Sequence, residues 1–115
     1  MGASRLALSL LESIDAKTLA PGQLFRLRLV QATALQYVGS HREARTLFEL
    51  AERQAPDDLR LSFALQHHGK CLVESGELDQ ARSKLEQARD LRTALGRAEL
   101  VASSERAIEA LDQST

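Results

Sequence analysis

The sequence has few aromatic residues, one cysteine and two prolines. Tryptophan is absent, and phenylalanine and tyrosine together make up 3% of the chain. A core must therefore be built from leucine and alanine, both of which favour helices. Cys71 is the only cysteine, which excludes an internal disulfide and gives no sign of an oxidising compartment. We predict a cytoplasmic protein.

Long apolar runs and an excess of one charge are also missing. No apolar stretch approaches the ~18 residues of a membrane span, and residues 1–11 lack the pattern of a signal peptide. The formal net charge is −1, and basic residues are spread along the whole length. Because this pattern gives no electrostatic footprint for nucleic acid, we expect neither a nucleic-acid partner nor a membrane.

Helical periodicity is present instead of strand patterning. Alternation at period two never persists, and turn residues break the chain at regular intervals. The predicted helices are 3–14, 21–38, 40–54, 58–74, 77–95 and 98–111. No connection between them is long enough to separate two domains, so residues 1–115 are predicted to form one all-α domain.

The ends of these helices carry recognisable signals. Ser40 and Glu43 have the spacing of a capping box. Asp57 precedes a helix as an N-cap, and Gly96 has the position of a glycine just after a helix.

An internal repeat is the most informative feature. Gly39 and Gly76 stand 37 residues apart, and each is followed at equal spacing by alanine, a large apolar residue and alanine. The aligned sets are Gly39, Ala44, Phe48 and Ala51, and Gly76, Ala81, Leu85 and Ala88. Self-similarity at a fixed period of this length is typical of stacked helical repeats.

Further residues fit the same pattern: Ala32 and Leu35 precede the first set, Pro56 follows it, and Gly69 and Leu72 precede the second set. The whole pattern resembles the tetratricopeptide repeat family. The resemblance implies a right-handed superhelical stack of antiparallel helix pairs, an α-solenoid of about six helices. It divides the chain into a half repeat 1–20, repeats 21–56 and 57–96, and a C-terminal capping helix 97–112. Two helices of a pair would cross closely at Ala32 and Ala44, and at Gly69 and Ala81.

The sequence departs from the family pattern at several points. Its period is 37 rather than 34 residues, and Arg28 and Leu65 take the usual tryptophan position. Gln31 and His68 are polar where the family usually has leucine.

The resemblance also implies a binding surface, because the first helix of each pair lines the concave face of such stacks. The residues expected there are Arg26, Leu29, Thr33, Gln36, Tyr37, Phe63, Gln66, Lys70, Val73 and Glu74. Tyr37 and Phe63 are the candidate anchors, although Phe63 could instead pack between repeats. The chain has no asparagine, which argues against the subclass that clamps a C-terminal carboxylate with lysine and asparagine.

No catalytic or metal-binding constellation emerges. His67 and Cys71 are four residues apart, a spacing that could hold a metal, but Cys71 falls on the packed side of its helix. No nucleophile or glycine-rich loop accompanies the polar residues. We expect a protein that is not an enzyme and carries no cofactor or metal.

The predicted helix 3–14 is apolar over much of its surface. Its leucines, with Ile14, cover about 200° where a helix with one neighbour needs about 100°. The chain is therefore predicted to be a piece or small member of a longer repeat protein, or a homodimer that joins through Leu8 and Leu11. Two functions follow: a scaffold that binds a peptide or protein on its concave face, or an oligomerisation or signal-coupling region of a larger bacterial regulator.

Overall fold

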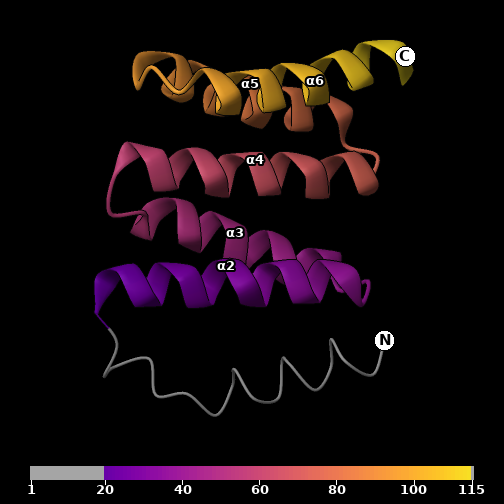
Figure 1. Cartoon of the computed structure of the whole chain (residues 1–115). Helices are drawn as coiled ribbons and strands as arrows, with labels where there is room; N and C mark the ends of the chain where they lie inside the picture. The colour runs from indigo at the N-terminus through magenta and orange to yellow at the C-terminus, as the bar shows by residue number, and fades with distance from the viewer. Residues whose placement is uncertain (1–19, 115) are drawn as a thin grey trace. The chain divides into compact units, whose positions relative to one another are not determined.

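A computed structural model describes residues 20–114 of the chain, and this part contains five helices and no strand (Figure 1). The helices are α2 (Pro21–Tyr37), α3 (His41–Gln54), α4 (Asp58–Glu74), α5 (Leu78–Ala94) and α6 (Ala98–Ser114). The predicted all-helical fold is confirmed for these residues, and each predicted helix end lies within three residues of the observed one. The predicted helix 3–14, with Leu8 and Leu11, lies outside the described residues.

The chain divides into two compact units, Met1–Pro56 and Asp57–Thr115. In the first unit α2 packs on α3, and the two run in opposite directions (Figure 1). In the second unit α5 packs on both α4 and α6, and again successive helices alternate in direction. None of the described helices is long and apolar enough to cross a membrane.

Three of the helix ends have the same glycine turn. Gly39, Gly76 and Gly96 have φ values of +88°, +78° and +70°, in the left-handed region that favours glycine. After α4, the Glu77 amide donates to the Leu72 carbonyl at 2.9 Å, which is the outer hydrogen bond of a Schellman motif. The same bond follows α2 and α5. The predicted role of Gly96 is therefore confirmed.

Of the two predicted N-caps, Asp57 caps its helix with its side chain and Ser40 does not. The Arg60 amide donates to Asp57 Oδ1 at 2.8 Å, so Asp57 caps α4 as predicted, and this bond holds the pKa of the Asp57 carboxyl below its ordinary value. Ser40 precedes α3, but its side chain makes no capping hydrogen bond. Its amide already donates to the Leu35 carbonyl in the glycine turn, so the group that a capping-box glutamate would accept from is occupied.

Small residues lie at the helix crossings of both units. In the first unit Ala32 and Ala44 are fully buried. In the second, a Cβ atom on Gly69 would lie 2.8 Å from Leu85 Cγ and 3.4 Å from the Ala81 carbonyl oxygen. The predicted close approach at Gly69 and Ala81 is thus confirmed.

The core of the second unit is formed by all three of its helices. It consists of Leu72, Ala81, Leu85, Ile108 and Leu111. Leu95 is 41% exposed, because α5 ends one residue before it.

Candidate functional site

The most unusual side chain of the second unit is Arg92, in the last turn of α5. It is 1% exposed, and its guanidinium lies between α4 and α6. Nε donates to Ser62 Oγ at 3.1 Å and Nη1 to Ser104 Oγ at 2.9 Å. Nη1 also lies 3.2 Å from Gln66 Oε1 and from the Leu100 carbonyl oxygen. All four acceptors are neutral, so no carboxylate is among the hydrogen-bonding partners of this buried cation.

Gln66 connects the two helices on either side of Arg92. The Ser104 hydroxyl donates to Gln66 Oε1 at 2.7 Å, and Arg92 Nη1 donates to the same oxygen. These two donors fix the orientation of the amide, since a flipped amide would place its NH₂ group against them. The side chain is 4% exposed, and its Nε2 is buried without a hydrogen-bond partner. The cluster therefore contains a buried donor that has no acceptor.

Phe63 covers one face of the same guanidinium. The Arg92 guanidinium carbon lies 5.0 Å from the centroid of the Phe63 ring, within the range of a cation–π contact. Phe63 is half-buried. We call Phe63, Ser62, Gln66, Arg92 and Ser104 the Arg92 cluster.

Two of the expected binding residues belong to this cluster. Phe63 was expected to be an anchor or, alternatively, to pack between repeats, and Gln66 was expected to face a partner. Both contact Arg92, because α5 continues to Ala94 and brings an arginine against this side of α4.

Positive charge extends from Arg92 to the outer surface of α4. Partial burial lowers the pKa of His67, and the nearby charges of Lys70 and Arg92 lower it further. Burial also lowers the pKa of Arg92, although a guanidinium stays protonated at any ordinary pH. Among the described residues no carboxylate contributes to either shift.

The other predicted binding residues have exposed or half-buried side chains. On α4, Lys70, Val73 and Glu74 are exposed, with Val73 at 38%. On α2, Arg26, Thr33 and Tyr37 are exposed, and Leu29 and Gln36 are half-buried. Tyr37 is 70% exposed. Gln36 Oε1 lies 2.7 Å from His41 Nδ1 and thereby links the two ends of the glycine turn.

One exposed apolar residue on α2 was not among the predicted binding residues. Val30 is 46% exposed on α2, and it lies seven residues before Tyr37, close to the same line along the helix. The α2 and α4 faces belong to separate units.

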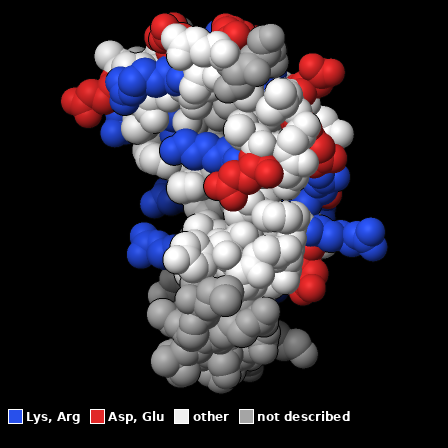
Figure 2. Space-filling view, turned by 90° about the vertical axis from the view of Figure 1, so that its right-hand side faces the viewer, with Lys and Arg blue, Asp and Glu red and all other residues white. Residues whose placement is uncertain are grey.

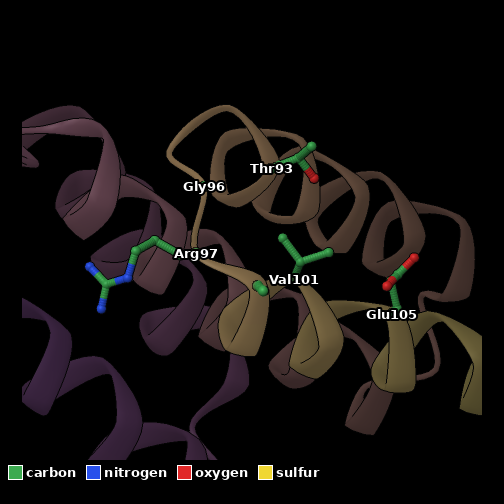
Figure 3. Close-up of a pocket in the computed structure, with 6 residues that line it drawn as sticks. Thr93, Gly96, Arg97, Val101 and Glu105 are labelled. Carbon is green, nitrogen blue, oxygen red and sulfur yellow. The ribbon is translucent and has the colours of Figure 1, made fainter.

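An open depression of about 410 Å³ lies between the end of α5 and the start of α6 (Figure 3). Val101 and Glu105 on α6 point towards α5, and Thr93 and Arg97 also line the depression. The Thr93 hydroxyl donates to the Arg89 carbonyl at 2.8 Å within its own helix. This arrangement brings no set of reactive groups together.

Figure 2 shows acidic and basic side chains interspersed on the face in view. In the described range 20–114, no three His, Cys, Asp or Glu side chains converge to hold a metal ion. Cys71 is buried, whereas His67, four residues before it on α4, is exposed.

The comparisons with known proteins identify no relative. No family model matches the chain, and no curated protein or solved structure matches it significantly.

The repeat period contains a signal that could have located the Arg92 cluster. A shift of 37 residues aligns Ser62 with Phe25, Gln66 with Leu29, and Arg92 with Ala55. Three polar residues of the second copy thus replace three apolar residues of the first. Such a joint change in aligned positions is what a buried polar cluster in one copy alone would produce.

Proposed function

We propose that this chain is a cytoplasmic, non-catalytic scaffold of the tetratricopeptide type, which binds a peptide or protein partner on the first helices of its pairs. The type of fold is supported by the glycine turn that recurs after α2 and α4, and by the small residues at the crossing of each pair. These features favour a repeat architecture whose use is to present a surface.

The observation that carries the proposed function is the location of the exposed large apolar residues. In the described residues these are Val30, Tyr37, Val73 and Leu95. Three of the four lie on the first helices, α2 and α4, and the fourth caps the end of α5. Because tyrosine is enriched among the residues that supply most of the binding energy at interfaces, and exposed apolar surface can mark an interaction site, the first helices are the better candidates for contact.

A photo-cross-linking experiment tests the proposal. A benzophenone amino acid replaces Tyr37, Val73 or Leu95, one at a time, in the full chain in its own cell. We expect positions 37 and 73 to capture the same protein, and position 95, which is about as exposed as Val73, to capture none. Capture at position 95 alone would contradict the proposal.

A binding measurement with the captured partner then gives the contribution of each side chain to the affinity. Val73→Ser and Tyr37→Ala should each weaken binding by about fivefold or more, the loss of a contact that contributes about 1 kcal/mol. Leu95→Ser is the matched control and should bind as the unchanged chain does.

A further inference from the structure

The Arg92 cluster holds positive charge that the second unit does not neutralise locally. Its guanidinium is buried, and every acceptor that it reaches is a neutral oxygen. The chain has 16 acidic and 15 basic residues, but no carboxylate of the described residues 20–114 hydrogen-bonds to this guanidinium. A buried cation without a counter-charge is costly to maintain. A ligand that brings a negative charge would reduce this cost.

The cluster also holds a donor that lacks an acceptor. Gln66 Nε2 is buried and unpaired, while Oε1 of the same amide accepts from both Arg92 and Ser104. An unpaired buried polar group is unfavourable by roughly the desolvation free energy of that group. Nε2 could be satisfied only by an acceptor that comes from outside the cluster or by a rearrangement of it.

Neighbouring residues on α4 define where this acceptor would approach. Phe63 precedes Gln66 by three residues and Lys70 follows it by four, so the three side chains lie on one face of the helix. Lys70 is exposed and Phe63 is half-buried. The surface of this face thus offers part of an apolar ring and an ammonium group, with His67 beside them and the Gln66 amide buried beneath.

We propose that the α4 face from Phe63 to Lys70 receives an aspartate or glutamate side chain from an acidic segment of the partner. The inference rests on the proposed scaffold function and names the chemistry of the partner. Lys70 pairs with the incoming carboxylate at the surface, the Gln66 side chain rearranges so that its buried Nε2 donates to the same carboxylate, and Arg92 supplies positive charge beneath them. The aliphatic part of the ligand side chain packs on Phe63.

Nuclear magnetic resonance on the full chain tests this inference. The probe is octaglutamate with both ends blocked, so that a terminal carboxylate does not contribute. We expect saturable shifts of the Gln66 side-chain amide and Arg92 Nε–H signals, and a rise in the pKa of His67 as negative charge arrives. Blocked octaglutamine, the neutral control, should leave these signals unchanged.

Two variants that each remove one positive charge show whether binding depends on the α4 face or only on the net charge of the chain. Lys70→Gln should weaken octaglutamate binding about threefold, the magnitude of one exposed charge pair. Lys84→Gln removes the same charge from α5 and should leave the affinity unchanged. Binding should also weaken with added salt, because screening shortens the range of these charges.

The outcomes distinguish this inference from the function on which it rests. If the Gln66 and Arg92 signals do not move, or move equally with octaglutamine or inorganic phosphate, the acidic-segment assignment is wrong. In that case cross-linking from Tyr37 and Val73 to one partner would still support the scaffold. Saturable shifts confined to the acidic peptide would support the assignment, whatever the cross-linking result.

Discussion

Gly69 of α4 and Leu85 of α5 approach so closely that a Cβ atom on the glycine would lie 2.8 Å from Leu85 Cγ. Leu85 is fully buried in the core of the second unit. The leucine therefore has little room to move aside, and the distance between the two helices depends on glycine at this position.

Gly69→Ala should destabilise the second unit. Overpacking of a core costs about 1–3 kcal/mol, and the higher helix propensity of alanine offsets about 1 kcal/mol of this. We expect a net loss of about 1 kcal/mol, measured by urea unfolding followed by circular dichroism. In a Leu85→Ala background the contact is gone, so the same glycine substitution should become stabilising. A loss of equal size in both backgrounds would contradict the steric explanation.

Gly76→Ala tests the backbone of the glycine turn. Nothing lies within 4 Å of a Cβ atom there, but φ is +78°. The left-handed backbone should cost alanine about 1–2 kcal/mol. Gly22→Ala is the control, because it has the same open space without a positive φ, and we expect a change within about 0.5 kcal/mol there. Equal effects at both positions would exclude backbone strain as the cause.

Ser104→Ala should disrupt the Arg92 cluster. It removes a hydrogen bond from Arg92 and a donor from Gln66, and leaving buried polar groups unpaired costs about 1–3 kcal/mol. The triple change Arg92→Met, Gln66→Leu and Ser104→Ala removes these three polar groups together and leaves Ser62, whose hydroxyl still donates to the Leu59 carbonyl. Because apolar replacements of buried charged clusters are often neutral or stabilising, we expect the triple variant to recover at least the original stability. Thermal and urea unfolding of both variants measure this.

The stability of the folded chain should depend on pH through His67. Its folded pKa lies below the ordinary value of 6.5, so the unfolded chain binds more protons as the pH falls below 6.5. The contribution of this group is complete above that value and is lost as the pH falls through the folded pKa. His67→Gln should therefore flatten the stability curve below pH 6.5, as measured by urea midpoints at several pH values. Lys70→Gln should raise the pKa of His67 in the folded chain.

The local features of the fold could be predicted from the sequence because their causes are local. Gly39 and Gly76 end helices through their own backbone freedom, and Asp57 caps α4 with its own carboxylate. The crossing at Gly69 followed from a small residue at a repeated position. The Ser40–Glu43 spacing predicted a capping box that does not form, because the Ser40 amide already donates to the Leu35 carbonyl in the preceding turn.

The Arg92 cluster could not be predicted from one helix at a time. An arginine in an exposed-looking last turn becomes buried only because Ser62 on α4 and Ser104 on α6 supply its acceptors. These residues lie 30 and 12 positions away in the chain. Phe63 and Gln66 were assigned to the binding face, with packing between repeats as the alternative for Phe63, because their contacts with Arg92 come from another helix. The outer residues Tyr37 and Val73 needed no such knowledge, since helical spacing alone places them opposite the packed side.

The exposed position of Tyr37 has a spectroscopic consequence. The chain has no tryptophan and one tyrosine, so its near-ultraviolet emission comes from a single ring that is already 70% in contact with solvent. Unfolding should change this emission little, and circular dichroism is the better measure of stability. A partner that covers α2 would change the environment of that ring directly. The intrinsic fluorescence of this chain is therefore a label-free signal for binding at α2 and a poor one for folding.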